Sequence, residues 1–231
     1  MPTILITGAN RGIGLALAKA YAADNWLVLA TCRHPGKADE LRALAKAHEG
    51  VEVRALDVAE PRAIRDFAAW LEGLPIDVLF NNAGMLGPRD GQSLGDIDYA
   101  GWAEVLRVNL LAPVAMAETL ADNVAASDRR VIAMMSSSMG SMAENKGGGY
   151  YLYRSSKAAL NMAVRSLAAD LRRRRVIVVA LHPGWVRTDM GGAGASLSPG
   201  RSAAGLKRVV DSLKLDDSGK FRRYDGSALP W

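Results

Sequence analysis

The sequence predicts one α/β domain built on a doubly wound, mostly parallel sheet of seven strands with helices on both faces. Apolar, β-branched segments alternate with segments of helical period along the whole chain. The strand segments are apolar almost throughout, which indicates a sheet that is covered on both faces. No repeat, linker or low-complexity block divides the 231 residues, so we expect residues 1–231 to form a single domain.

The elements follow one another in regular order. We expect strands at Thr3–Thr7, Trp26–Cys32, Val51–Asp57, Asp77–Ala83, Arg130–Ser136, Val176–His182 and, with a weaker pattern, Lys220–Tyr224. We expect helices at Arg11–Ala23, Lys37–His48, Arg62–Leu71, Tyr99–Val124 and Tyr153–Arg172, and a last helix that begins after Ser198 with Pro199. Right-handed crossovers between parallel strands place ligands at the carboxyl ends of the strands.

The composition is that of a globular protein and does not indicate a nucleic-acid-binding or membrane protein. The formal net charge is +5, hydrophobic residues make up 49% and charged residues 23% of the chain, as in ordinary globular proteins. The run Arg172–Arg175 suits a solvated helix C-terminus, and no nucleic-acid-binding motif accompanies it. We see no signal peptide and no apolar run of membrane-spanning length. Cys32 is the single cysteine, so we expect no disulfide and a cytoplasmic location.

A glycine-rich turn joins the first strand to the first helix. It reads Thr7-Gly8-Ala9-Asn10-Arg11-Gly12-Ile13-Gly14. Glycines let the backbone turn sharply and approach a pyrophosphate, and the helix N-terminus supplies amide donors and a positive dipole end. The strand–turn–helix context therefore predicts a dinucleotide-binding domain of the Rossmann type.

The spacing Gly-x-x-x-Gly-x-Gly resembles the short-chain dehydrogenase/reductase family, and further motifs repeat the resemblance in the family's order across residues 3–190. They are Asn81-Asn82-Ala83-Gly84, Asn109 in a Val-Asn-Leu run, Ser136–Gly140, Tyr153-Arg154-Ser155-Ser156-Lys157 and Pro183–Thr188. The run that begins at Tyr153, with the C-terminal Tyr-Asp-Gly and Pro-Trp, is most similar to the sniffer and C-factor branch of carbonyl reductases. The resemblance implies a Rossmann fold and an NAD(P)-dependent oxidoreductase.

The resemblance implies a catalytic set of Ser137, Tyr153, Lys157 and Asn109. Tyr153 and Lys157 are four residues apart and share one helix face. An ammonium beside a phenol favours the phenolate, so we expect Lys157 to lower the pKa of Tyr153. Tyr153 would then act as general acid or base while a serine hydroxyl polarises the substrate oxygen. The Ser-x-x-Gly pattern selects Ser137, and Ser138 stays open as the alternative.

The residues at the end of the second strand indicate whether the cofactor is NAD or NADP. The segment Ala30–His34 has no carboxylate to bind the ribose hydroxyls of NAD. Arg33 and Arg11 would instead bind the 2′-phosphate, so we expect NADP(H), with NAD(H) as the alternative. The cofactor-binding residues implied by the resemblance are Gly8, Asn10, Arg11, Gly12, Ile13, Gly14, Arg33, Asp57, Val58, Asn82, Ala83, Gly84, Tyr153, Lys157, Pro183, Gly184, Val186 and Thr188. The histidines show no metal-ligand spacing, and we expect no metal.

Two irregular stretches border the expected site. The interval between Ser137 and Tyr153 is longer than the family pattern, with the extra length near Gly147–Gly149. The segment Thr188–Ser198 is rich in glycine and has little apolar area, so we expect a short mobile lid over an open site. The substrate-contacting residues would be Ser137, Met139, Tyr153, Trp185 and Met190.

The sequence as a whole predicts an NADPH-dependent oxidoreductase that reduces a small ketone or aldehyde to an alcohol, or catalyses the reverse. The sequence does not identify the substrate. An NAD-dependent alcohol dehydrogenase and a non-enzymatic, dinucleotide-binding signalling protein are the alternatives. Because the family often associates through its long helices, we expect a homodimer or homotetramer, and no nucleic-acid or membrane partner.

Overall fold

Seven parallel strands form the central sheet in a computed structural model that describes residues 1–231. Their order is β3-β2-β1-β4-β7-β8-β9. The strands are β1 (Thr3–Thr7), β2 (Leu27–Cys32), β3 (Val51–Ala55), β4 (Val78–Asn81), β7 (Val131–Met135), β8 (Ile177–His182) and β9 (Phe221–Arg223). This confirms the predicted doubly wound, seven-stranded sheet. The strand order reverses between β1 and β4, where such sheets bind ligands.

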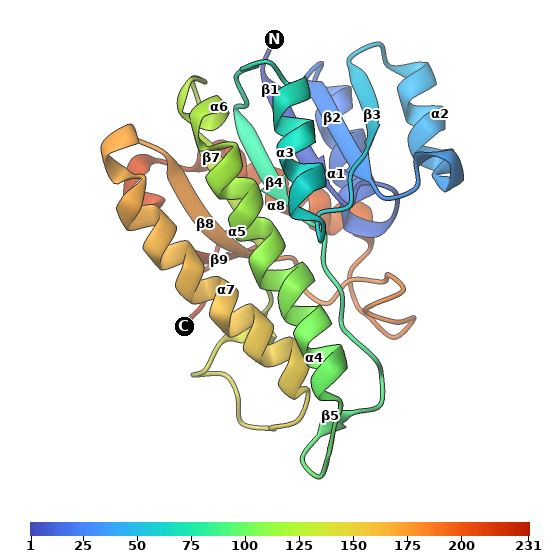
Figure 1. Cartoon of the computed structure of the whole chain (residues 1–231), viewed down its shortest axis with the longest axis vertical. Helices are drawn as coiled ribbons and strands as arrows, with labels where there is room; N and C mark the ends of the chain where they lie inside the picture. The colour runs from blue at the N-terminus through green and yellow to red at the C-terminus, as the bar shows by residue number, and fades with distance from the viewer.

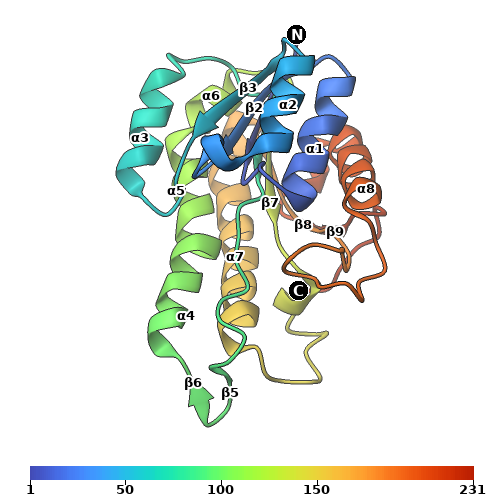
Figure 2. The same cartoon turned by 90° about the vertical axis from the view of Figure 1, so that its right-hand side faces the viewer.

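Helices cover both faces of the sheet (Figures 1 and 2). One face carries α1 (Gly12–Ala23), α2 (Asp39–Ala47) and α8 (Pro199–Ser212). The other carries α3 (Pro61–Trp70), α5 (Ala112–Thr119), α6 (Ala121–Ala125) and α7 (Tyr151–Asp170). Alternate strand residues supply the two cores: Ile4 and Ile6 point to the first group of helices and Leu5 to the second. Short 3₁₀ turns occur at Pro35–Lys37, Ser138–Gly140, Arg172–Arg174 and Leu215–Asp217.

The helical stretch predicted over Tyr99–Val124 is present, but it is not one regular α-helix. The segment is divided into α4 (Tyr99–Leu106), a π-helical turn at Arg107–Leu111, α5 and α6. Pro113 has no N–H to donate to the carbonyl of Asn109, so a regular α-helical ladder is interrupted there. The wider π turn accommodates the gap and places Asn109 on the buried side.

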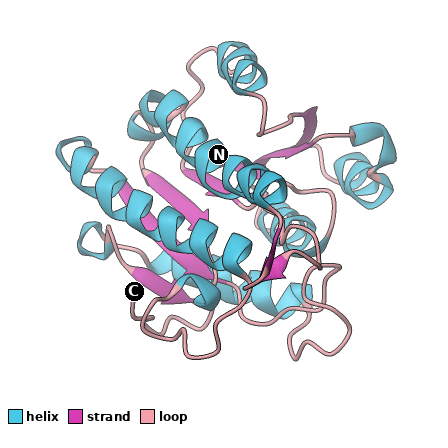
Figure 3. Cartoon of the chain, turned by 60° about the horizontal axis from the view of Figure 1, so that its bottom comes forward, coloured by secondary structure: helices cyan, strands magenta, loops and turns pink.

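The loops at the carboxyl ends of the strands gather on one side of the molecule, and Figure 3 views the chain with that side turned forward. The N-terminus lies at the opposite end of the strands (Figure 1). A small hairpin of β5 (Gln92–Ser93) and β6 (Asp96–Ile97) extends beyond the sheet and was not predicted (Figure 2). None of the helices combines the length and apolar character needed to span a membrane.

Candidate active site

The glycine turn after β1 is tightly packed. Gly8 has a φ of +66°, and a Cβ on it would lie 3.0 Å from the Cα of Ala83. A Cβ on Gly14 would lie 2.3 Å from the carbonyl oxygen of Gly8. Gly12 has a φ of +55° and faces Thr188, whose methyl group would be 3.1 Å from an added Cβ. The turn therefore requires glycine at all three positions.

Hydrogen bonds join this turn to the end of β4. The Thr7 hydroxyl accepts bonds from the main-chain N–H groups of Asn82 and Ala83, both at 3.0 Å. The Asn82 side-chain amide donates to the carbonyls of Thr7 at 2.9 Å and Gly8 at 3.1 Å. The two predicted cofactor motifs consequently form one rigid unit at the point where the strand order reverses.

Ser137 and Tyr153 meet at the carboxyl end of β7. Both side chains are buried, and the Ser137 hydroxyl lies near enough to Tyr153 to lower the pKa of that phenol. Ser137 also accepts a bond from the Met139 N–H at 3.2 Å. Ser138 is the first residue of the 3₁₀ turn, and its N–H donates to His182 Nδ1 at 3.2 Å. Of the two serines left open by the sequence, Ser137 is the one that acts on the pKa of Tyr153.

Lys157 lies behind Tyr153 on the same helix. Its Nζ donates to the Met135 carbonyl at 2.9 Å and lies 5.8 Å from the centre of the Tyr153 ring. Burial lowers the pKa of Lys157 to about 8. Burial raises the pKa of Tyr153 to about 12, against a lowering contribution from the Ser137 hydroxyl. The structure therefore does not show the tyrosine pKa lowered by Lys157 that the sequence led us to expect, because the loss of solvation dominates.

Asn109 is completely buried beside this pair. Its side chain accepts a bond from the Met85 N–H at 2.9 Å and donates to the Met85 carbonyl at 2.8 Å and to the Ser156 hydroxyl at 3.0 Å. An added Cβ on Gly84 would lie 3.2 Å from Asn109 Oδ1 and 3.6 Å from Lys157 Nζ. The π turn thus brings Asn109 to the same small space as the lysine.

The segment after β8 completes the border of the site. Val186 is buried and pairs with Leu197 as an isolated β-bridge. Gly184 has a φ of +82°, and a Cβ on it would lie 2.3 Å from a Leu197 methyl carbon. Ser202 donates to the Pro183 carbonyl at 2.7 Å. Pro183, Gly184, Val186 and Thr188 are therefore all placed near the carboxyl ends of the strands, as predicted.

The predicted lid, Thr188–Ser198, is more closely packed than its composition indicates. Ala195 and Leu197 are 2% and 7% exposed, and the Arg187 guanidinium donates to the carbonyls of Ala195 and Ser196. The expectation that the segment recovers little apolar area is thus wrong at its C-terminal end. Trp185 and Met190, by contrast, are exposed. The mobility of the segment stays a prediction.

Arg33 and Arg11 are the two arginines that the sequence assigns to the 2′-phosphate. Arg33 is exposed just beyond the end of β2, without an ion pair or hydrogen bond through its side chain. Arg11 immediately precedes α1 and forms an ion pair with Asp189. Asp57 accepts a bond from the Ala59 N–H at 3.0 Å, and Val58 packs on the core beside it. Asn10 is exposed, whereas Ile13 packs against the core.

Sequence reasoning missed the side chains that hold the site in place. The Ser136 hydroxyl donates to Asn161 Oδ1 at 2.6 Å, and the Asn161 amide donates to the Gly140 carbonyl at 3.1 Å. Ser156 donates to the Tyr153 carbonyl at 2.8 Å and accepts from Asn109. Ser156 belongs to the Tyr-x-x-x-Lys run and was available as a signal, but the partners of Asn161 and His182 depend on the folded structure. No cluster of three or more His, Cys, Asp or Glu side chains is arranged to hold a metal ion.

Comparison with known proteins identifies the family. The model of the short chain dehydrogenase family matches residues 2–196. C-signal of Myxococcus xanthus is 45% identical over 168 residues, which cover 73% of this chain and 100% of that protein.

Two solved structures of carbonyl reductases are similar to this chain over its whole length. The carbonyl reductase Sniffer of D. melanogaster has a TM-score of 0.93 at 35% identity, and the match covers 100% of both chains. The NADPH-bound carbonyl reductase from chicken fatty liver has a TM-score of 0.93 at 32% identity, and the match covers 100% of this chain and 99% of that one. The resemblance drawn from the motifs is confirmed, and the chain belongs to the short-chain dehydrogenase family.

Proposed function

We propose that this protein is an NADPH-dependent carbonyl reductase that uses Ser137, Tyr153, Lys157 and Asn109. The observation that carries the proposal is the burial of these four side chains in one place, with Lys157 Nζ 5.8 Å from the centre of the Tyr153 ring and both Lys157 and Asn109 next to Gly84. This group lies at the carboxyl edge of the sheet, where the rigid glycine turn also ends. The NADPH bound by the chicken fatty liver relative supports the same cofactor here.

The residues present fit a dinucleotide. The glycine turn packs closely on Ala83 and Asn82 and leads directly into the N-terminus of α1, which is the arrangement that binds a pyrophosphate. The unpaired guanidinium of Arg33 suits the 2′-phosphate, and Lys157 and Asn109 flank the exposed Gly84, where the nicotinamide ribose would lie. Bound NADPH would supply the hydride for the carbonyl carbon.

The chain's own residues would then act on the carbonyl oxygen. The Tyr153 hydroxyl donates its proton as negative charge develops on that oxygen, and the Ser137 hydroxyl donates a second hydrogen bond. The raised pKa of Tyr153, about 12, keeps the phenol protonated at neutral pH. Lys157, with a pKa of about 8, is mostly an ammonium there and stabilises the phenolate that forms. These protonation states favour reduction over alcohol oxidation.

A turnover assay tests this proposal. The chain is incubated with NADPH or NADH and a panel of ketones and aldehydes, and oxidation of the cofactor is followed by its absorbance. We expect NADPH-dependent turnover, and a loss on the order of 10²-fold or more in Tyr153→Phe with unchanged NADPH binding. Faster turnover with NADH would favour the NAD-dependent alcohol dehydrogenase. Tight NADPH binding without turnover of any carbonyl would favour the signalling function, which the similarity to C-signal raises.

We also propose a cytoplasmic homodimer or homotetramer. The exposed apolar side chains Tyr99, Leu111 and Met162, between 59% and 73% exposed, lie on α4, the π turn and α7. Burial of such groups stabilises an interface between copies. Light scattering at micromolar concentration tests this, and a mass of one chain would contradict it.

A further inference from the structure

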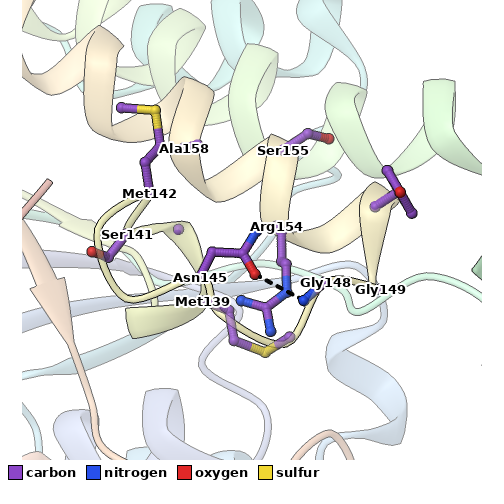
Figure 4. Close-up of a pocket in the computed structure, with 11 residues that line it drawn as sticks. Met139, Ser141, Met142, Asn145, Gly148, Gly149, Arg154, Ser155 and Ala158 are labelled. Atoms are coloured by element: carbon purple, nitrogen blue, oxygen red, sulfur yellow. Dashed lines mark hydrogen bonds between the residues drawn. The ribbon is translucent and has the colours of Figure 1, made fainter.

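A cavity of about 250 Å³ lies between α7 and the irregular loop Ser141–Gly149 (Figure 4). Its wall includes Met139, Met142, Asn145, Tyr151, Arg154 and Ser155. Tyr153 and Lys157 are not among its lining residues. Residues one and two positions along a helix point in different directions, so Arg154 and Ser155 leave α7 on another side from Tyr153. The cavity is thus distinct from the space around Gly84.

Arg154 is a cation without a partner in this cavity. Its side chain forms no ion pair and no hydrogen bond, and its Nε is sealed from solvent with no acceptor. The carboxylate of the loop, Glu144, is bonded to Arg223 at 2.7 Å instead. A buried donor without an acceptor costs free energy relative to one that is satisfied. Arg154 therefore brings to the wall of the cavity a guanidinium that has no acceptor within the chain.

The other polar side chains on the cavity wall, Asn145 and Ser155, do not supply an acceptor for Arg154. Asn145 Oδ1 already accepts from the Gly148 N–H at 3.2 Å, so its amide nitrogen is the group that remains to donate (Figure 4). The Ser155 hydroxyl accepts from Trp102 Nε1 at 2.8 Å and donates to the Leu152 carbonyl at 3.3 Å. Met139, Met142 and Tyr151 form apolar walls, and methionine side chains adapt to varied shapes.

We propose that this cavity binds a small organic carboxylate, with Arg154 as its counter-ion and the apolar body against the methionines and Tyr151. A planar guanidinium matches a carboxylate with two parallel hydrogen bonds. The cavity's size suits a single small ring or a short chain. The carboxylate belongs either to a carbonyl substrate that reaches past Met139 or to a separate small molecule. Both sources require the same recognition by Arg154.

Calorimetric titration tests the binding directly, with benzoate as the probe and methyl benzoate as its uncharged match. We expect the unmodified chain to bind benzoate and not the ester. Arg154→Gln should weaken benzoate binding roughly 10- to 150-fold, and Arg154→Lys should weaken it less. The matched control is Arg165→Gln, which removes the same charge about three turns further along α7, where Arg165 donates to the Gly219 carbonyl at 3.1 Å.

The outcomes decide the proposal independently of the catalytic one, because binding needs no turnover. No binding of benzoate, equal binding of the ester, or equal affinity in Arg154→Gln would overturn it. A matching loss in Arg165→Gln would also overturn it, since the effect would then be one of net charge. Steady-state inhibition by benzoate separates the two sources. Competition with the carbonyl substrate supports a distal substrate carboxylate, and inhibition without competition supports a separate ligand.

Discussion

Replacement of Gly14 by alanine sets two effects against each other. Gly14 lies in the first turn of α1, in a backbone conformation open to other residues, and alanine is favoured over glycine in a helix by about 1 kcal/mol. The added Cβ would, however, lie 2.3 Å from the Gly8 carbonyl oxygen and 2.5 Å from the Asn82 amide nitrogen. These two atoms are themselves hydrogen-bonded at 3.1 Å and have little freedom to move.

The steric clash outweighs the gain in helix propensity, so it decides the sign of the change in the free energy of unfolding. Overpacking costs typically about 1–3 kcal/mol, and contacts this short belong at the upper end. After the helix propensity is subtracted, we expect Gly14→Ala to lower the free energy of unfolding by about 2 kcal/mol. Because the displaced atoms belong to the dinucleotide turn, NADPH affinity should fall as well.

A second glycine in the first turn of a helix is the matched control. Gly200 lies in the first turn of α8, and a Cβ there would meet nothing within 4 Å. Gly200→Ala should therefore raise the free energy of unfolding by about 0.4–1 kcal/mol and leave NADPH binding unchanged. Urea unfolding and NADPH titration measure both variants. If Gly14→Ala were as stable as Gly200→Ala, the steric reasoning would be refuted.

Three further predictions concern charge. Arg33→Asp should weaken NADPH binding roughly 10- to 150-fold and NADH binding much less, and an equal loss for both cofactors in a titration would refute the role of Arg33. The kcat/KM for carbonyl reduction should fall as pH rises through about 8, because Lys157 then loses its ammonium charge; a profile unchanged across that range would contradict this. Burial, with a smaller contribution from Arg223, lowers the pKa of His182 from 6.5 to about 4, so the unfolded chain binds the proton first and stability falls as pH drops from 6.5 toward 4. The loss approaches roughly 3 kcal/mol at the acid end, and urea unfolding of His182→Gln should show a smaller pH dependence.

The sheet and the glycine turn were predictable from the sequence because local patterns determine them. Apolar, β-branched segments such as Thr3–Thr7 and Val176–His182 leave few alternatives to buried parallel strands, and the structure starts or ends these strands within one residue of the prediction. The spacing of Gly8, Gly12 and Gly14 is likewise visible in a turn that leads into a helix. The sequence does not show the contacts with Ala83 and Asn82 that make Gly8 and Gly14 necessary, because those residues are distant along the chain.

The remaining details depend on contacts between distant residues. The hairpin β5–β6 has only two residues in each strand, so it carries no periodic pattern. The raised pKa of Tyr153 arises from burial that only the assembled loops produce. The surroundings of Ser137 and Ser138 depend on His182, 44 positions beyond Ser138, which accepts the Ser138 N–H. The sequence supplied the chemical groups, and the tertiary structure determined their surroundings.

Because of the π turn at Arg107–Leu111, we expect this helical segment to tolerate the loss of a residue less well than a substitution at an exposed position. A π turn holds one residue more than an α-helical turn, and each residue of a helix advances its direction by about 100°. Deletion of one residue here would permit a more regular helix, yet it would rotate either Asn109 or the core residues Met116 and Ala117 to the wrong side. Substitutions at exposed Leu111 should be tolerated in the isolated chain, whereas single-residue deletions between Arg107 and Leu111 should not. In an evolving lineage, this stretch would accept new side chains at exposed positions such as Leu111 but keep Asn109 and a fixed number of residues.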